Sequence, residues 1–565
     1  MEKRLILAIF LSFLILFLYQ LIFVKSQKTT PRAPETVSAV EQVEPKKKQP
    51  LTAEPKPESA ERQAPVKGEI VIAEKEEFPT IDTPLFTAIW SNRGGVLRSW
   101  KLKKHLKKLP ARGESQKELL DLVPESAGKT GIYPFSLKTS DPEMDDKINT
   151  ALYKIEAGGM SLSEGEKGSV IFGYSDGNTV KVIKEFVFNG DNYDFEIKTR
   201  LEISGKEVDP LLLWGPGISS LAPEEMKQKF SANRGAAFLI DKKVIRLQEK
   251  KIGPENEAVR YSRLDWAGYE ENYFTTLFLL EPGRSQAFTF KIELAEEQPD
   301  GKTAVIPYSY LAFSHPDEAY IGPKEYDRLT GYGHQTKKII NFGFFGGIAE
   351  LLLVATKYFY KFFPNWGLAI IIMTFIIKIL FFPLTYSSTK SMAKMQEIQP
   401  KIKALRAKYK RAKQDMEQRR QMNEELMRLY KEHGINPASG CLPLLIQLPV
   451  FWGFFRMLVV AVEFRHSPFV FWIKDLSVRD PYYVTPILMG ITQYISQKMT
   501  PSTADPTQQK MMLLMPFIFT IFFMNFQAGL VLYWLTNNVL QIAQQAIMNR
   551  MMAGKRENDG KRRKK

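Results

Sequence analysis

Residues 366–385 of this 565-residue chain read WGLAIIIMTFIIKILFFPLT, a run in which Lys378 is the one charged side chain. Twenty residues in a helix cover about 30 Å, enough to cross the apolar core of a bilayer. The run therefore predicts a membrane-spanning helix. Placing a lysine inside such a helix costs free energy unless the side chain faces protein or water. Lys378 is therefore expected to have polar surroundings.

Apolar segments of the same kind recur elsewhere in the chain. Further spans are predicted at 442–463, 482–498, 511–525 and 527–548, and one more at 5–24. Residues 1–25 are interpreted as an uncleaved N-terminal transmembrane anchor, because no small-x-small cleavage site of a signal peptide follows Val24. The predicted fold class is a polytopic α-helical membrane protein with six transmembrane helices, together with a separate all-β domain.

The β domain is predicted from residues 68–330, where apolar and polar residues alternate. The alternation is clear in Thr179–Phe188, Tyr193–Lys198 and Phe288–Ile292, and a period of two is typical of half-buried strands. Turn signals at 176–178 and 189–191 separate these runs. Many short strands without regular helices between them predict a β-sandwich.

Two connecting segments flank this domain. Residues 26–67 contain seven prolines and no aromatic residue, which predicts a disordered linker. Residues 331–362 combine Lys337 and Lys338 with spaced apolar residues, which three glycines interrupt within 339–352. The segment is predicted to be an interfacial amphipathic helix, with a plain buried helix as the alternative.

The net charge of +16 concentrates in two segments beside the spans. Residues 387–434 hold 13 Lys/Arg against 6 Asp/Glu, and residues 550–565 hold 8 against 2. Basic loops mark the cytosolic side, so both termini are expected in the cytosol and the β domain outside. Two apolar stripes predict that 387–434 is a cytosolic helical hairpin, with a solvated linker as the alternative. The stripes are Ile398, Ile402, Leu405 and Tyr409, followed by Met422, Leu426, Leu429 and His433.

Common catalytic signatures are absent from the sequence. None of the five histidines lies in a predicted span, and neither an HExxH motif nor a GxxxxGK[ST] loop occurs. The membrane part is therefore predicted to be no enzyme and to need neither a metal nor a cofactor. Acidic residues in the β domain leave open a sugar-binding or sugar-modifying protein with a membrane anchor.

Polar side chains accumulate in the predicted spans. Thr374 lies one helical turn from Lys378, and the other spans contribute Gln447, Gln493, Asn525, Gln527, Thr536, Asn537, Asn538 and Gln541. We interpret these residues as a hydrophilic pocket, although polar residues also hold membrane helices together and a lysine can snorkel to the headgroups. A small-anion transporter or channel that uses Lys378 is the alternative function. Arg456 and Glu463, seven residues apart, are predicted to pair.

Several motifs resemble one known family. The run Asn436–Phe451 (NPASGCLPLLIQLPVF) is similar to the third-span signature of the YidC family of membrane protein insertases. The same family is indicated by Phe382–Thr385, Ser391–Met395, Asp480–Tyr483, Pro486–Gly490, Gln508–Lys510 and Gly529–Trp534, and its Gram-negative periplasmic domain by Trp266, Gly268 and Tyr320–Lys324. The resemblance is strong over about 335–550.

The resemblance implies a function and a site. It implies a membrane protein insertase and chaperone that moves hydrophobic segments of newly made proteins from the cytosol into the bacterial inner membrane through a hydrophilic groove, alone or with the Sec translocon. Lys378 occupies a position that is usually arginine in this family. The expected groove residues are Lys378, Thr374, Gln447, Gln493, Trp534 and Asn537.

The resemblance also implies partners and a domain plan. Contacts with the ribosome and the signal recognition particle receptor are expected through Lys394, Lys401, Lys403, Arg406, Lys408 and Arg411. Nascent membrane proteins and anionic lipids are the other expected partners, and no small-molecule substrate is expected. The β domain should be a galactose-mutarotase-like supersandwich. The expected plan is an anchor at 1–25, a linker at 26–67, the periplasmic domain at 68–330, the interfacial helix at 331–362, a five-span insertase core with its hairpin at 363–549, and a basic tail at 550–565.

Overall fold

The computed structural model describes residues 69–110, 117–218, 234–297, 303–409, 415–435, 442–500 and 506–563, with side chains except at 442–444, 506–511 and 552–563. The predicted anchor at 1–25, the linker at 26–67, Arg411 and residues 436–441 of the family motif lie outside the described residues. The chain divides into two compact units. One contains residues 390–437 and 501–514, and the other contains the β domain and the remaining helices.

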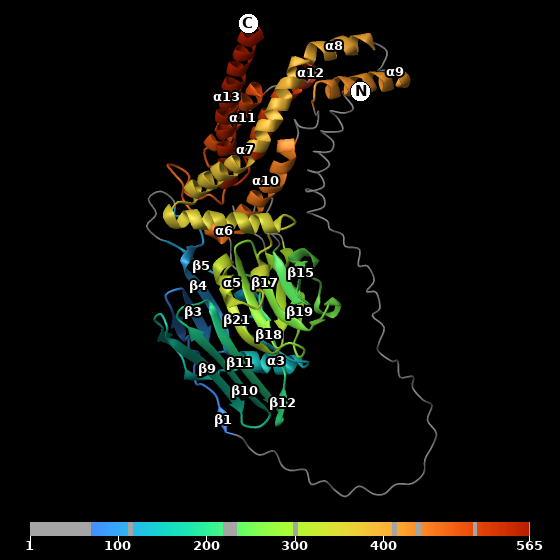
Figure 1. Cartoon of the computed structure of the whole chain (residues 1–565). Helices are drawn as coiled ribbons and strands as arrows, with labels where there is room; N and C mark the ends of the chain where they lie inside the picture. The colour runs from blue at the N-terminus through green and yellow to red at the C-terminus, as the bar shows by residue number, and fades with distance from the viewer. Residues whose placement is uncertain are drawn as a thin grey trace, which may run out of the picture. The chain divides into compact units, whose positions relative to one another are not determined.

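The β domain is built from three sheets, and its strands are antiparallel except for the pair of β2 and β8. The 11-stranded sheet follows the order β1 (Ile70–Val71), β9 (Lys167–Asp176), β10 (Val180–Asn189), β11 (Asp194–Ile203), β21 (Pro316–Pro323), β18 (Phe274–Leu280), β17 (Leu264–Glu270), β14 (Gly235–Ile240) and β15 (Lys243–Gln248), with β7 (Lys154–Ala157) and β12 (Lys206–Val208) beside β9 and β11. Figure 1 shows β9, β10, β11, β21 and β18 running side by side.

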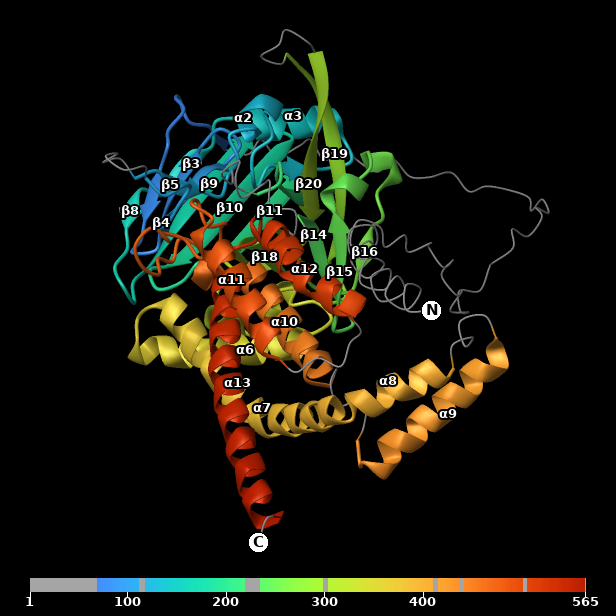
Figure 2. The same cartoon turned by 90° about the horizontal axis from the view of Figure 1, so that it is seen from above.

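Two five-stranded sheets complete the domain. One follows the order β16 (Tyr261–Ser262), β19 (Gln286–Glu297), β20 (Thr303–Phe313), β13 (Leu211–Trp214) and β6 (Leu137–Lys138). The other follows the order β5 (Leu119–Asp121), β4 (Val96–Leu106), β3 (Phe86–Ser91), β2 (Thr80–Asp82) and β8 (Met160–Ser161). The long hairpin of β19 and β20 extends beyond the neighbouring strands in Figure 2.

Local sequence explains the central hairpin of the large sheet. Val180, Val182, Lys184, Phe186 and Phe188 are buried in alternation along β10, as a period of two requires. The turn before β10 is closed by the Asp176 carboxylate, which accepts from the backbone N–H groups of 178, 179 and 180. Gly177 supplies the left-handed conformation of this turn, with φ +73°. The strands predicted at 179–188, 193–198 and 288–292 are confirmed as β10, β11 and β19.

Aromatic side chains pack between the sheets. Trp90 on β3 lies 4.2 Å from Phe186 on β10, measured between ring centroids. Phe278 on β18 stacks on Phe313 of β20 at 4.0 Å. Each fully buried ring contributes about 2 kcal/mol by leaving water. These contacts join each five-stranded sheet to the large one, which gives the β part a sandwich-like core.

Short helices interrupt the β domain, so the prediction that no regular helices lie between its strands is wrong at these places. They are α2 (Ala127–Thr130), α3 (Pro142–Thr150), the 3-10 turns η1 (Glu249–Lys251) and η2 (Glu255–Glu257), and α5 (Tyr326–Tyr332), which follows the last strand. Asp141 caps α3 by accepting from the N–H groups of Glu143 and Met144, and Pro142 fits the first helical position.

The segment at 331–362 is not one helix. Thr336–Ile339 form a 3-10 turn, η3, and helix α6 covers only Gly346–Phe362. Gly343 adopts φ +75°, a left-handed conformation that no continuing α-helix contains. In α6, Leu352 and Leu353 are buried, whereas Leu351, Val354 and Tyr358 are exposed. The helix therefore presents an apolar face that the described residues do not cover.

All five segments predicted as spans after residue 363 are helical. They correspond to α7 (Trp366–Glu397), α10 (Leu442–Val460), α11 (Val484–Met499), α12 (Pro506–Phe523) and α13 (Ala528–Arg563). Among the described residues, α7 alone is long and apolar enough to cross a membrane by length and composition, and Leu445–Val460 and Met512–Phe523 are shorter apolar helices. The α13 helix continues into the basic tail predicted at 550–565.

The predicted pair of Arg456 and Glu463 is wrong. Helix α10 ends at Val460, and Glu463 lies in the 3-10 turn η5 (Val462–Phe464), so a helical spacing of seven does not apply between them. Glu463 pairs instead with Lys357 of α6 at 3.0 Å. The Arg456 guanidinium donates to the backbone carbonyl oxygen of Asn341.

In the other unit, residues 390–435 contain two antiparallel helices, α8 (Gln399–Lys408) and α9 (Met416–Glu432), which lie side by side in Figure 2. Their seam contains Met395, Ile398, Ile402, Tyr430 and Ile435, with Leu426 and Leu429 packed against them. Asp415 caps α9 by accepting from the N–H groups of Glu417 and Gln418. Of the predicted stripes, Ile398, Ile402, Leu426 and Leu429 lie in the seam, whereas Met395, Tyr430 and Ile435 are seam residues that the stripes missed.

Candidate functional site

Helix α13 gathers most of the predicted groove residues. Trp534, Asn537 and Gln541 follow one another at helical spacings of three and four, so they lie on one face of α13. Each of them makes a hydrogen bond to a different helix. We call these three residues, with their partners Lys378, Gln447 and Gln493, the polar ladder.

Lys378 forms the end of the polar ladder. Its ammonium Nζ donates to the amide Oε1 of Gln541 at 2.9 Å. An ammonium has three N–H donors, and Gln541 is its one hydrogen-bond acceptor among the side chains that the structure describes. None of the described carboxylates forms an ion pair with it. The positive charge of Lys378 is therefore held by a neutral partner within an apolar helix.

Two further pairs continue the polar ladder along α13. Gln447 on α10 donates from Nε2 to Oδ1 of Asn537 at 2.8 Å. The indole Nε1 of Trp534 donates to Oε1 of Gln493 on α11 at 3.1 Å. In a membrane helix, side-chain amides of this kind must find partners, because the surrounding lipid offers none. The polar ladder thus ties α13 to α7, α10 and α11.

Thr374 has a different environment from the other predicted groove residues. Its side chain is 1% exposed, and its hydroxyl donates to the carbonyl oxygen of Ile370 one turn earlier in α7. This internal bond uses the hydroxyl proton. The structure therefore brings Lys378, Gln447, Gln493, Trp534 and Asn537 into hydrogen bonds around α13 and leaves Thr374 outside them.

Aromatic rings enclose one side of Trp534. Its indole lies 5.0 Å from the ring of Phe451 in an edge-to-face arrangement and 5.5 Å from the ring of Phe523. Such edge contacts fix the orientation of an aromatic ring. The indole N–H therefore keeps its direction toward Gln493 on α11.

Sequence reasoning gave Gln541 and Asn538 no separate role. Gln541 is the hydrogen-bond partner of Lys378, and Asn538 donates to the backbone oxygen of Met489 on α11 at 3.1 Å. A signal for Gln541 was present, because it lies seven residues after Trp534 and four after Asn537 on the same helical face. The pairing of Gln541 with α7 requires the register between two helices, which a single sequence does not contain.

The basic residues of the hairpin belong to the unit that contains residues 390–437. Lys394, Lys401, Lys403, Arg406 and Lys408 are exposed, while Arg411 lies outside the described residues. Lys408 pairs with Glu425 at 2.8 Å. The neighbouring hydroxyl of Tyr409 also donates to Glu425, and both hydrogen bonds lower the pKa of this carboxyl, that of Lys408 foremost. The hairpin thus combines an apolar seam with a basic exterior.

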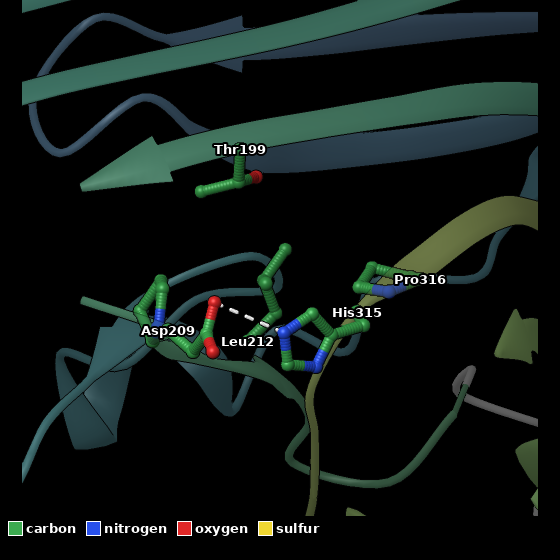
Figure 3. A pocket seen from close by; sticks show the side chains of 6 residues that line it. Thr199, Asp209, Leu212, His315 and Pro316 are labelled. Atoms are coloured by element: carbon green, nitrogen blue, oxygen red, sulfur yellow. Dashed lines mark ion pairs between the residues drawn. The ribbon is translucent and has the colours of Figure 1, made fainter. Parts of the chain in front are cut away.

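The β domain has one small pocket that merits description (Figure 3). It is lined by Thr199, Asp209, Pro210, Leu212, His315 and Pro316, is partly open and has a volume of about 60 Å³. This volume accommodates a few water molecules. His315 Nε2 lies 3.0 Å from the Asp209 carboxylate. Such a small pocket gives no support to a sugar-modifying enzyme.

Comparisons with known proteins agree over both parts of the chain. The family described as YidC periplasmic domain matches residues 79–355, and the family described as 60Kd inner membrane protein matches residues 358–556. A protein of Geobacter metallireducens named membrane protein insertase YidC is 36% identical over 566 residues, which cover 98% of this chain and 99% of the relative. A protein of the same name from Geobacter sulfurreducens is 36% identical over 479 residues, or 84% of this chain and 86% of the relative.

Among solved structures, the crystal structure of an active YidC insertase with the first transmembrane domain resolved is 20% identical. It matches 85% of this chain and 93% of its own chain with a TM-score of 0.35. The family matches and the identity to relatives over nearly the whole length decide the assignment. This chain belongs to the YidC family of inner membrane proteins, which combine a membrane core with a YidC periplasmic domain.

Proposed function

We propose that this protein is a membrane protein insertase, which transfers hydrophobic segments of newly made proteins from the cytosol into the inner membrane. The relatives that match nearly the whole chain carry this name. The YidC family is not an enzyme family, and none of the comparisons supports the small-anion transporter alternative. The chemistry to be explained is therefore transfer without a covalent step.

The observation that carries the proposal is the state of Lys378. Its ammonium is bound by one neutral amide, that of Gln541, inside an apolar helix. A positive charge with spare donors in a low-dielectric environment attracts an anion strongly. Acidic residues in the polar flank of an incoming segment are the anions we expect it to hold. Lysine presents a point charge and not a fork of donors, so it attracts carboxylates without requiring bidentate geometry.

The polar ladder extends this site along α13. The pairs Gln447–Asn537 and Gln493–Trp534 are neutral hydrogen bonds between side chains. These side chains can give up their hydrogen bond to each other and form hydrogen bonds to the backbone of a substrate. Because the number of hydrogen bonds is conserved, the change in free energy is small. The apolar part of the substrate then moves sideways into lipid, which is favoured by burial of its apolar surface. We propose that the polar ladder lines the groove through which the polar flank crosses.

Short helices would assist this crossing. Helix α11 has 16 residues and α12 has 18 residues. At 1.5 Å per residue these helices reach only about 24 and 27 Å, less than a typical hydrocarbon core of about 30 Å. A bilayer thins around helices that are too short for it. A thinner bilayer shortens the apolar distance that the polar flank of a substrate must cross.

The proposal includes the membrane topology and the domain plan. Six transmembrane helices, with the first in residues 1–25, place both termini in the cytosol and the β domain in the periplasm, as the basic loops indicate. The proposed boundaries are those predicted from the sequence, except that the interfacial helix is α6, Gly346–Phe362. Action beside the Sec translocon, and binding of anionic lipids by the basic segments, belong to the same proposal.

The hairpin of α8 and α9 is proposed to meet the ribosome and the targeting receptor. Its exposed lysines Lys401 and Lys403 suit a phosphate-rich or acidic surface. The double variant Lys401→Glu/Lys403→Glu should co-sediment less with ribosomes at low salt and should remain inserted in the membrane. Unchanged co-sedimentation would exclude these two side chains from the contact.

The test of the insertase proposal is a substitution series at Lys378. Full-length protein with Lys378→Arg, Lys378→Ala or Lys378→Glu is reconstituted in vesicles, and insertion of a single-span substrate with an acidic outer tail is measured by protease protection. Arg should preserve insertion, Ala should reduce it and Glu should abolish it. The matched control is Lys181→Glu, which reverses an exposed lysine on β10. Equal insertion by all four variants would contradict the proposed role of the charge.

A further inference from the structure

The loop between α10 and α11 contains a tight aromatic turn at residues 469–473. The N–H of Phe469 donates to the carbonyl oxygen of Ile473 at 3.0 Å, and the N–H of Ile473 donates back to Val470 at 3.1 Å. Ile473 is buried beneath the turn. These bonds close the turn on itself, so residues 470–472 form a defined tip.

The tip exposes a large apolar side chain at a strained position. Phe471 is 80% exposed and adopts φ +52°. This left-handed conformation is unfavourable for a bulky residue and would suit glycine or asparagine. The neighbouring Trp472 stacks near Phe471 with ring centroids 6.0 Å apart, and its indole N–H donates to Asp480 at 3.0 Å. A strained backbone thus holds one aromatic ring outward beside a second that is fixed by a hydrogen bond.

The position of the turn relative to α7 follows from Asn365. Its side-chain oxygen caps α7 by accepting from the N–H of Leu368, and its side-chain N–H donates to the carbonyl oxygen of Phe469 at 3.0 Å. The same residue therefore marks the first turn of the apolar helix and holds the aromatic turn. Gly367 on α7 lies against the Phe469 ring, so closely that an added Cβ would come within 2.1 Å of it. The turn consequently lies at the level where α7 leaves the membrane.

Cations surround the base of the same loop. Arg465 donates to the carbonyl oxygens of Leu106 and Lys107 at the end of β4, at 2.9 and 3.3 Å. Lys474, two residues after the tip, and Lys104 on β4 are exposed. Burial and the positive charge of Arg465 lower the pKa of His105 to about 3, so this histidine is neutral and adds no charge at neutral pH. The contact with β4 also places this loop on the side of the β domain, which is the periplasmic side.

We propose that the aromatic turn 469–473 inserts Phe471 into the periplasmic leaflet of the bilayer and that Lys474 binds the phosphate of a phospholipid headgroup beside it. Aromatic rings at the ends of membrane helices favour the boundary between headgroups and acyl chains. A lysine beside them attracts anionic headgroups electrostatically. The proposal requires that α7 crosses the membrane and does not depend on the insertase activity. It commits to lipid as the occupant of the exposed tip.

The first experiment measures the depth of residue 471 in lipid. Cys441 is the one cysteine of the chain, so Cys441→Ser provides the background for Phe471→Cys, labelled with an environment-sensitive fluorophore. The full-length protein is placed in nanodiscs that contain lipids with a nitroxide quencher near the carbonyl or near the end of the acyl chain. We expect blue-shifted emission and quenching that is strongest for the shallow quencher.

The matched control is Phe78→Cys in the same background, because Phe78 is an exposed phenylalanine of the β domain. The label at 78 should remain unquenched by either lipid. Equal, weak quenching at 471 and 78 would overturn the proposal. A second outcome would also overturn the proposal: a label at 471 that is shielded from water, is not quenched by lipid and responds to the ratio of protein to lipid. That result would indicate contact with a second copy of the chain.

The second experiment tests Lys474. Shallow quenchers are attached either to a phosphatidylglycerol or to a phosphatidylcholine, and their quenching of the label at 471 is compared. The anionic lipid should quench more strongly in the parent chain, and Lys474→Glu should remove this difference. Equal quenching by the two lipids in the parent chain would overturn the assignment of Lys474 to a phosphate.

Discussion

Lys184 of the β domain and Lys378 of the membrane part are held differently. Lys184 on β10 is fully buried, and its ammonium donates to the carbonyl oxygens of Gly94, Phe135 and Gly95 at 2.7, 2.8 and 3.3 Å. Lys378 on α7 donates to one side chain, that of Gln541. Three acceptors match the three donors of an ammonium, whereas one acceptor leaves donors over.

The difference separates a structural lysine from a functional one. In the β domain, Lys184 joins the turn between β3 and β4 to residue 135 and has no capacity for a further ligand. In the membrane part, Lys378 keeps such capacity, and its one partner is a neutral amide that another acceptor can replace. The number of hydrogen bonds that each ammonium makes within the fold therefore predicts that Lys184 stabilises the β domain and that Lys378 binds a substrate.

The largest expected effect on stability is that of Lys184→Met. Loss of the ammonium leaves buried carbonyl groups without their donor, so the free energy of unfolding of the β domain should fall by about 3 kcal/mol. Hydrogen exchange of the β10 amides in the full-length protein measures this change. The control, Lys181→Met, alters an exposed lysine on the same strand and should change stability by less than about 0.5 kcal/mol. Similar effects of the two variants would remove the structural role of Lys184.

The pH dependence of stability sharpens the same assignment. Burial lowers the pKa of Lys184 from 10.5 to about 7. Between these values the unfolded chain binds a proton that the folded chain does not, so this lysine makes stability rise as pH increases from about 7 to about 10. Hydrogen exchange, corrected for its intrinsic rate, should show this rise in the parent chain and a smaller one in Lys184→Met. Parallel pH profiles would contradict the lowered pKa.

A moderate effect is expected from the Gln447–Asn537 pair of the polar ladder. Asn537→Leu should lower the thermal stability of the protein in detergent, since it leaves the Gln447 amide without its partner. Hydrogen bonds between membrane helices contribute about 0.6 kcal/mol on average, so the double variant Gln447→Leu/Asn537→Leu should recover most of the loss. The contradicting result is simple additivity of the two substitutions, which would mean that the side chains do not interact.

The smallest stability effect should be that of Lys378→Gln. Because Lys378 has one hydrogen bond to lose and glutamine can still bond to Gln541, we expect a change of less than about 0.5 kcal/mol. Insertion of a substrate with an acidic tail should nevertheless decline. A large loss of stability would place Lys378 in the same structural class as Lys184 and would break the comparison.

The sequence predicted the two lysines unequally. Lys378 was found because one charge in an apolar run is conspicuous. Lys184 was missed, although it has the same parity as Val182 and Phe186 on an alternating strand, which is a signal for burial. The sandwich strands and the hairpin seam were readable because their periods of two and 3.6 residues are local.

Contacts between distant elements were not readable from the sequence. The Lys378–Gln541 bond depends on the register between α7 and α13, and the wrong Arg456–Glu463 pair assumed a helix that ends earlier, at Val460. The hydrogen bond from Asn365 to Phe469 joins α7 to a loop more than a hundred residues away, which no local pattern indicates. The periodicity of a sequence predicts which face of a helix or strand is buried. It does not predict which other element packs against that face.

A charge exchange tests the central claim most directly. Insertion into vesicles is measured for the parent chain and Lys378→Glu, each with two substrates that differ only in an acidic or a basic outer tail. Our account predicts that Lys378→Glu loses the acidic-tailed substrate and gains the basic-tailed one relative to the parent. Loss of both substrates by a correctly folded Lys378→Glu, or equal insertion of both by the two proteins, would contradict attraction by the charge of Lys378.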